Sequence, residues 1–271
     1  MADENCTHDC SSCGDRTAPR DPHIAPGAGT KIKKVVAVMS GKGGVGKSSV
    51  TAALAAALRK SGKTVGVLDA DITGPSIPKL FGVRERAVAT PMGIAPVNTE
   101  TGIPIMSLNL LTADETDPVI WRGPVIAGVL QQFWTDVQWG ELDVLLIDMP
   151  PGTGDVAITV FQSLPVDGIL MVTSPQQLAT MIVTKAVKMA GEMKIPIWGV
   201  IENFSTFRCP DCGKEHPIFG ESHTEEILKN FGLPLLAQLP IDPALAAAGD
   251  KGEVEKADLS VFQKVAEALP L

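Results

Sequence analysis

The stretch from residue 35 to residue 60 constrains the fold most, because it indicates a strand, a glycine-rich turn and a helix in direct succession. Residues 35–39 form a short apolar run rich in β-branched side chains, which is typical of a buried parallel strand. The next residues, Gly41-Lys42-Gly43-Gly44-Val45-Gly46-Lys47-Ser48, match the pattern G-x-x-x-x-G-K-[ST], and a helical pattern continues to Lys60. In this context the pattern predicts a loop whose backbone N–H groups enclose the phosphates of a nucleotide.

Three side chains of this loop have expected roles. Lys47 is predicted to contact the β- and γ-phosphates, and the Ser48 hydroxyl is predicted to ligate Mg²⁺. Lys42 is an additional lysine, which is not needed to hold phosphate within one chain. Either Lys42 reaches a nucleotide bound by a partner subunit, as an arginine finger does in trans, or it is a solvated loop lysine.

Strand-like runs alternate with helical patterns along the rest of the chain. The further strands are expected at residues 64–68, 144–147, 168–172, 197–201 and 235–239. This alternation predicts an α/β fold, with a mostly parallel sheet and helices on both faces in a Rossmann-like three-layer sandwich. The Pro- and Gly-rich residues 84–108 interrupt the alternation, and we expect a surface hairpin or an insertion there.

Acidic residues follow two of the expected strands. Asp148 ends the apolar run 144–147, so it should lie at the carboxyl edge of the sheet, where the Walker B Asp holds Mg²⁺. Asp69 and Asp71 end the run 64–68, and we expect one to orient the attacking water and the other to support Mg²⁺. The alternative is that these residues only cap helices at strand–helix turns.

The composition excludes several classes of protein. Asp and Glu number 31 against 23 Lys and Arg, so the net charge is −8, which disfavours non-specific binding to nucleic acid or anionic membranes. No apolar run reaches the roughly 18 residues that span a bilayer, and the first fifteen residues lack the apolar stretch of a secretory signal. We therefore expect a cytoplasmic protein without nucleic-acid or membrane partners, whose cysteines are reduced.

Two parts are expected along the 271 residues. Residues 1–30 lack hydrophobic periodicity, contain cysteines, and are rich in Pro and Gly after residue 16, which predicts a disordered tail and linker. Residues 31–271 are predicted to form one P-loop ATPase domain that also carries a C-x-x-C metal loop.

The cysteines fall into two groups, Cys6, Cys10 and Cys13 near the N-terminus, and Cys209 and Cys212 much later. Clusters of this kind in a reducing compartment indicate metal ligation rather than disulfides. Cys209 and Cys212 supply two thiolates, and a symmetric dimer would supply the other two of a tetrahedral site.

Three interpretations of the later pair stay open. It could share a [4Fe–4S] cluster or a zinc ion between two subunits, form a mononuclear zinc site with His216, or act as a redox pair. Cys6, Cys10 and Cys13 have cluster-like spacing for three ligands, with His8 or an external group as the fourth. The alternative for these three is a tail without a metal function.

The motifs together resemble the Mrp/ApbC family of ATP-binding iron–sulfur cluster carriers. This family lies within the deviant Walker A group that includes MinD, ParA and the nitrogenase iron protein. The resemblance covers residues 32–265, and the matching stretches are residues 41–49, 69–76, 121–124, 148–155, 202–205, 209–212 and 239–243.

The resemblance implies a homodimer with two ATP sites near the interface, where Lys42 would act across the dimer. It implies a labile [4Fe–4S] cluster that bridges Cys209 and Cys212 of both subunits and passes to apo-proteins. ATP hydrolysis would be slow and serve as a switch. Asn203 would contact the adenine edge, and residues 240–242 would pack on the base.

The candidate site residues form three sets. Those expected to be catalytic are Lys42, Lys47, Asp71 and Asp148. Those expected to bind the nucleotide are Gly41, Lys42, Gly43, Gly44, Val45, Gly46, Lys47, Ser48, Ser49, Asp69, Asn203, Pro240 and Asp242. Those expected to bind metal are Ser48, Cys209, Cys212, Cys6, Cys10 and Cys13.

Two other functions were weighed against this one. A positioning ATPase of the MinD type needs a basic amphipathic C-terminal helix, whereas residues 258–269 carry only Lys264 against Asp258 and Glu267, so this segment should pack on the core. An ATP-gated electron donor like the nitrogenase iron protein takes its ligands from separate single cysteines, unlike the C-x-x-C pair here.

Overall fold

The computed structural model describes residues 23–72, 74–112, 123–175 and 179–271. The expected tail ligands Cys6, Cys10 and Cys13 lie outside these residues. The expected linker is described only from residue 23 onward, where the Ile24 N–H donates to the Ser163 carbonyl at 2.8 Å and the Trp134 indole donates to the Ile24 carbonyl at 2.7 Å. Among the described residues, Ile24 thus already contacts the folded body, ahead of the boundary expected at Lys31.

The predicted α/β architecture is confirmed. The central sheet has the strand order β12-β9-β8-β1-β7-β2-β6-β5, and all its neighbouring pairs are parallel except the edge pair β5 and β6. The strands are β1 (Lys31–Ser40), β2 (Val65–Asp69), β5 (Val97–Asn98), β6 (Pro104–Met106), β7 (Glu141–Asp148), β8 (Gly168–Thr173), β9 (Ile197–Glu202) and β12 (Leu235–Gln238).

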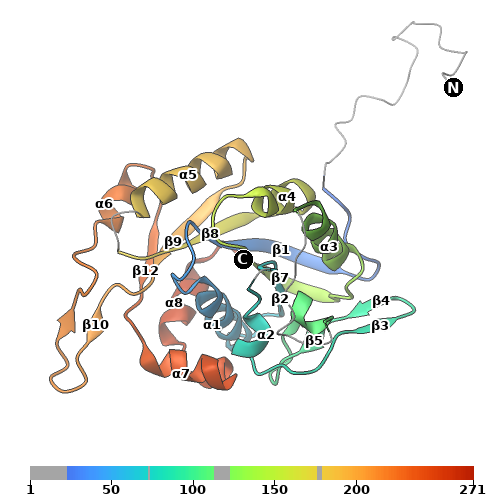
Figure 1. The fold of residues 1–271 in the computed structure, drawn as a ribbon, viewed down its shortest axis with the longest axis horizontal. Helices are drawn as coiled ribbons and strands as arrows, with labels where there is room; N and C mark the ends of the chain where they lie inside the picture. Colours follow the sequence, from blue (N-terminus) through green and yellow to red (C-terminus); the bar gives the residue numbers. More distant parts are fainter. Residues whose placement is uncertain (1–22, 73, 113–122, 176–178) are drawn as a thin grey trace, which may run out of the picture.

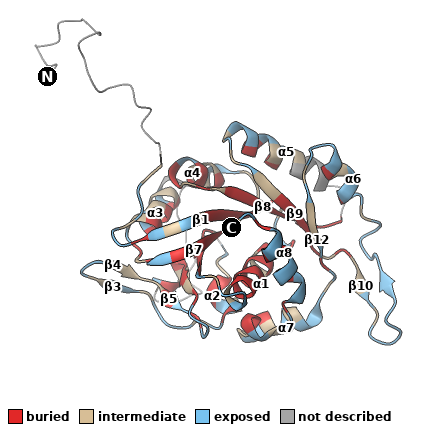
Figure 2. Ribbon diagram, turned by 180° about the vertical axis from the view of Figure 1, so that it is seen from behind, coloured by how far each residue is buried: buried red, intermediate tan, exposed pale blue. Residues whose placement is uncertain are grey.

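Helices cover both faces of this sheet (Figure 1). One face carries α1 (Lys47–Lys60), α2 (Ile77–Leu80), α7 (Pro243–Lys251) and α8 (Ser260–Ala268). The other face carries α3 (Gly123–Thr135), α4 (Asp155–Ser163), α5 (Ala179–Glu192) and α6 (Thr224–Lys229). The middle strands are therefore buried on both sides (Figure 2), which explains their continuous apolar runs.

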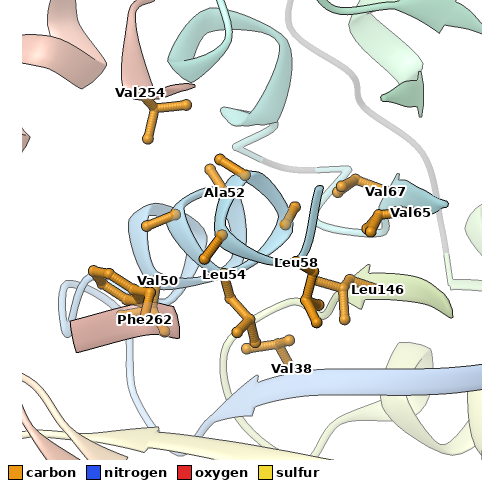
Figure 3. Close-up of a cluster of buried hydrophobic side chains, with 14 of the residues drawn as sticks. Val38, Val50, Ala52, Leu54, Leu58, Val65, Val67, Leu146, Val254 and Phe262 are labelled. Carbon is orange, nitrogen blue, oxygen red and sulfur yellow. The ribbon is translucent and has the colours of Figure 1, made fainter. Parts of the chain in front are cut away.

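The alanine-rich helix α1 lies at the centre of one core layer. From α1, the Leu54 side chain packs toward Val38 of β1, and the Val50 side chain lies beside Phe262 of α8 (Figure 3). The expectation that residues 258–269 pack on the core is confirmed, because Phe262 and Val265 are buried in this layer. Because α1 is fixed between the sheet and α8, the loop that precedes it has a rigid support.

Residues 84–108 only partly match the expected hairpin or insertion. A hairpin forms from β3 (Val88–Thr90) and β4 (Gly93–Ala95), but β5 and β6 then join the edge of the central sheet. These two strands are two and three residues long, so they are too short for a periodic pattern. Among the described helices, none is both long enough and apolar enough to cross a membrane.

Candidate functional site

The phosphate-loop motif connects β1 to α1 at the carboxyl edge of the sheet, as predicted. Gly44 and Gly46 have φ angles of 77° and 79°, which glycine adopts without steric cost. The loop curves around a cavity of about 200 Å³. This phosphate cavity is lined by Ser40, Gly43, Gly44, Gly46, Lys47, Ser48, Ser49, Asp71 and Pro151.

Asp148 is fully buried at the end of β7, beside the loop. Its Oδ1 lies 2.8 Å from the Lys47 Nζ and accepts a hydrogen bond of 2.8 Å from the Thr51 hydroxyl. Its Oδ2 accepts a hydrogen bond of 2.6 Å from the Ser48 hydroxyl. The two oxygen ligands expected for Mg²⁺, Ser48 and Asp148, are therefore side by side and already oriented.

Asp69 is Asp148's register partner on the neighbouring strand β2, and it is also fully buried. Its Oδ1 accepts the Asp71 N–H at 3.2 Å, and its Oδ2 accepts the N–H groups of Ser76 and Ile77 at 3.1 and 3.2 Å. This carboxylate therefore supports the turn after β2, whereas Asp71 lines the phosphate cavity. Direct contact between Asp69 and a nucleotide, as expected from the sequence, is not the role that these bonds favour.

The two buried carboxyls perturb each other. Burial, followed by repulsion from the Asp148 carboxylate, raises the pKa of Asp69 to about 8. Burial also raises the pKa of Asp148, although Lys47 and the Ser48 and Thr51 hydroxyls oppose this shift. With Asp69 protonated at neutral pH, Lys47 and the Asp148 carboxylate form the charged pair of this cluster.

A second cavity of about 200 Å³ continues from the phosphate cavity and shares Gly46 and Ser49 with it. This base cavity is largely apolar and is lined by Asn203, Phe204, Leu239, Pro240, Asp242 and residues of α7 and α8. Asn203 and the 240–242 segment thus lie together beside the loop. The arrangement matches a nucleotide whose phosphates occupy the first cavity and whose base occupies the second, with Gly46 and Ser49 shared between them.

Two of these side chains, Asn203 and Asp242, also form hydrogen bonds with the backbone. The Asn203 Nδ2 donates to the Val45 carbonyl at 2.9 Å, so it holds the phosphate loop itself. The Asp242 Oδ1 accepts the N–H groups of Ala244 and Leu245 at 2.8 and 3.0 Å, which caps α7. Lys42 is half-buried at the start of the loop and is not among the described residues that line the phosphate cavity.

The two cysteines lie at the tip of a hairpin formed by β10 (Phe207–Arg208) and β11 (Glu215–His216). This cysteine hairpin projects from the body and is almost entirely exposed (Figures 1 and 2). The Cys209 N–H donates to the Lys214 carbonyl and the Gly213 N–H donates to the Cys209 carbonyl, both at 2.9 Å. Gly213 has a φ of 70°, which permits the tight turn.

The turn also affects the acidity of the Cys209 thiol. The backbone N–H groups of Cys212 and Asp211 point at its sulfur and lower the pKa of the Cys209 thiol, which favours the thiolate that ligates metals. Both cysteines are free. Within the described ranges, no group of three or more His, Cys, Asp or Glu side chains could hold a metal ion, so the expected alternative with His216 is not assembled there.

The cysteine hairpin is joined to the base cavity by hydrogen bonds. The Ser205 N–H donates to the Leu239 carbonyl at 2.8 Å, and the Ile241 N–H donates to the Thr206 carbonyl at 2.7 Å. Residues 203–208 thus run from the base cavity through β10 to Cys209, which directly follows that strand.

The comparison with known families agrees with this geometry. A family model named ParA, described as NUBPL iron-transfer P-loop NTPase, matches residues 31–269. This chain belongs to that family. The iron-sulfur cluster carrier protein of Methanocaldococcus jannaschii is 51% identical to it over 225 residues, which are 82% of this chain and 78% of the relative.

Other relatives in the family extend the match. The iron-sulfur cluster carrier protein of Clostridium perfringens is 44% identical, over 91% of this chain and 93% of its own length. The cytosolic Fe-S cluster assembly factor NUBP1 homolog of Caenorhabditis elegans is 44% identical, over 83% of this chain and 74% of its own. The resemblance drawn from the motifs is therefore confirmed.

Solved structures of P-loop NTPases share the fold. The nucleotide-binding protein of Archaeoglobus fulgidus in complex with ADP is 42% identical, with a TM-score of 0.76 over 84% of this chain and 91% of that one. The cell division ATPase MinD of Pyrococcus furiosus has a TM-score of 0.62 at 22% identity, which supports the fold alone.

Thr51 and Glu202 are polar residues of this region that the sequence analysis missed. Thr51 lies one helical turn after Lys47, so its hydroxyl reaches the same carboxylate. Glu202 is fully buried at the end of β9 and accepts hydrogen bonds from the side chains of Ser222, Thr224 and Gln238. The spacing of Thr51 from Lys47 is a signal for its position. Glu202 falls in the matching stretch 202–205 and directly follows the expected strand 197–201, but no role was expected for it.

Proposed function

We propose that this protein is an ATP-dependent carrier of iron–sulfur clusters. It holds a [4Fe–4S] cluster between Cys209 and Cys212 of two identical subunits and transfers the cluster to apo-proteins. The observation that carries this proposal is the pair of free thiols, half-buried Cys209 and exposed Cys212, on a hairpin that one short segment joins to the base cavity. The names of the relatives as cluster carriers support the choice of cargo.

The nucleotide side of the proposal follows from the two joined cavities. ATP places its base beside Asn203 and its phosphates in the loop, as the ADP complex of the Archaeoglobus relative supports. Ser48 and Asp148 hold Mg²⁺, which neutralises phosphate charge. Lys47 leaves Asp148 for the β- and γ-phosphates, and Asp71 orients the attacking water. Hydrolysis is slow and acts as a switch.

The dimer follows from the number of ligands. Two thiolates are half of a four-thiolate site, and a two-fold axis beside the hairpin tip brings an identical pair to the same metal group. Ile218 and Phe219 follow β11 and remain 55% and 42% exposed. Such side chains gain from burial against a second copy. In that arrangement Lys42 reaches the nucleotide of the partner subunit.

The expected setting is the cytoplasm, where recipient proteins are available and thiols stay reduced. The Caenorhabditis relative is named a cytosolic assembly factor, which supports this setting. The acidic net charge of −8 gives no attraction to nucleic acid or anionic membranes.

The test compares the unchanged chain with the double variant Cys209→Ser and Cys212→Ser, both purified without oxygen. The unchanged chain should hold about four iron and four sulfide per dimer, with visible absorption that a chelator removes. The double variant should lose both but keep its affinity for ADP, because the cysteine hairpin lies outside the nucleotide cavities.

Two results would contradict the proposal. Cluster transfer to an apo-protein by the double variant would remove the cysteines from the mechanism. One zinc per dimer without visible absorption in the unchanged chain would make the hairpin a structural clasp.

A further inference from the structure

Arg208 lies beside the cysteine turn and has no role in the function described so far. It is the last residue of β10, directly precedes Cys209 and is exposed. A Cβ atom built on Gly213 would lie 3.7 Å from the Arg208 Nη2 and 3.8 Å from its Nε. Since Gly213 directly follows Cys212, the guanidinium spans from one end of the thiol-bearing turn to the other.

The direction of this side chain is informative. The antiparallel ladder pairs Arg208 with Glu215, an opposite charge that would be an ordinary cross-strand partner. The guanidinium instead extends over Gly213 of the turn. The guanidinium therefore lies beside the turn that carries the two cysteines.

The Arg208 charge decides the net charge of the cysteine hairpin. Asp211 lies between the two cysteines, Lys214 directly precedes β11, and Glu215 is its first residue. With Arg208 included, the formal charges of residues 207–215 cancel. Without Arg208, each hairpin would carry one net negative charge beside its thiolates.

A four-thiolate metal site is itself negative. Four thiolates around a [4Fe–4S]²⁺ core leave two net negative charges, and four thiolates around Zn²⁺ leave the same number. Enclosing these charges between two chains that each carry a net charge of −8 is unfavourable. Two guanidinium groups, one from each subunit, would balance the two charges of the site.

We propose that Arg208 is a cargo-binding residue. Its guanidinium compensates the negative charge of the shared metal site and donates hydrogen bonds to the cysteine or cluster sulfur atoms. The planar set of N–H donors suits this role better than a lysine ammonium, which acts as a point charge. The proposal rests on the proposed function, because it takes the metal group to be shared between two copies.

The experiment uses the full chain, reconstituted with iron and sulfide without oxygen, and three variants. Arg208→Gln removes the charge, and Arg208→Lys keeps the charge but loses the donor geometry. Arg84→Gln is the matched control, since Arg84 is an exposed residue shortly before β3, and β3 lies at the end of the molecule away from β10 (Figure 1). Both Gln variants change the net charge of the chain equally.

The readouts are the rate of iron loss to excess chelator and the midpoint potential of the bound cluster. Arg208→Gln should lose iron about three- to tenfold faster than the unchanged chain, since partly exposed charge pairs contribute modestly. Its potential should become more negative, because the reduced cluster carries one more negative charge. A tenfold change in the relative stability of the two oxidation states corresponds to about 59 mV. Arg208→Lys should fall between, and Arg84→Gln should match the unchanged chain.

The outcomes separate this proposal from the proposed function. If Arg208→Gln and Arg84→Gln behave alike in both readouts, the role of Arg208 is overturned. If the unchanged chain holds zinc rather than iron, the proposed function fails, and the same variants are compared by zinc release to a chromophoric chelator. Equal rates of zinc release, or no metal in the unchanged chain, would overturn the role of Arg208 as well.

Discussion

Replacing Gly46 by alanine perturbs the point where the phosphate and base cavities meet. Gly46 has a φ of 79°, and an L-residue in this left-handed region costs about 1–2 kcal/mol. The added Cβ would lie 2.4 Å from the Asn203 Nδ2 and 3.2 Å from the Phe204 ring. Asn203 must therefore move, and its hydrogen bond to the Val45 carbonyl is lost.

The loss of that buried hydrogen bond adds about 1–3 kcal/mol. The expected decrease in the free energy of unfolding for Gly46→Ala is therefore about 2–5 kcal/mol, as the sum of backbone strain and hydrogen-bond loss. ADP affinity should fall as well, because Gly46 lines both cavities.

Two neighbouring glycines provide matched controls. Gly44 has a φ of 77° but open space around its Cβ position, so Gly44→Ala should cost only the strain, about 1–2 kcal/mol. Gly43 has open space and no positive φ, so Gly43→Ala should leave stability unchanged or raise it slightly. The measurement is urea unfolding without nucleotide. If Gly46→Ala is no less stable than Gly44→Ala, the inferred contact with Asn203 is refuted.

Two further predictions concern the buried carboxyls. Folding raises the pKa of Asp69 from 3.8 to about 8. Between these two pH values the folded state holds a proton that the unfolded chain has released. The free energy of unfolding should therefore decrease as the pH rises from about 4 to 8, by at most ~1.4 kcal/mol per pH unit. Urea midpoints of Asp69→Asn between pH 6 and 8 should decrease less than those of the unchanged chain, and parallel curves would contradict the assignment. Thr51→Val removes a hydroxyl donor from Asp148 and should lower the free energy of unfolding by about 1–3 kcal/mol, whereas Thr159→Val, which loses only a bond to the helix carbonyl of Asp155, should change it little. Equal costs for these two threonines in urea unfolding would remove Thr51 from the site.

The strands of the central sheet could be predicted from the sequence because they are buried on both faces. Such strands are continuous apolar runs, and their order along the chain fixes a parallel sheet once helices intervene. The edge strands β5 and β6 carry no such signal. β6 begins with Pro104, and its pairing depends on Val67 and Leu68 of β2 rather than on its own pattern.

The candidate site was predictable to the extent that topology determines it. Asp148 follows a central strand, so its position beside the phosphate loop follows from the parallel sheet. The sequence could not separate Asp69 from Asp71, because both follow β2 and differ only in which way their side chains point. That difference depends on the backbone N–H groups of Ser76 and Ile77, which turn toward Asp69 only in the folded chain.

Glu202 joins the segments at the base of the cysteine hairpin to β12. Its carboxylate accepts hydrogen bonds from Ser222 and Gln238 at 2.5 and 2.9 Å, and its carbonyl accepts the Leu239 N–H at 2.7 Å. The base of the cysteine hairpin is thus fixed to the end of β12, while its tip is free of the body. Because Leu239 also lines the base cavity and its carbonyl accepts the Ser205 N–H, the same segment borders that cavity and supports the base of the cysteine hairpin.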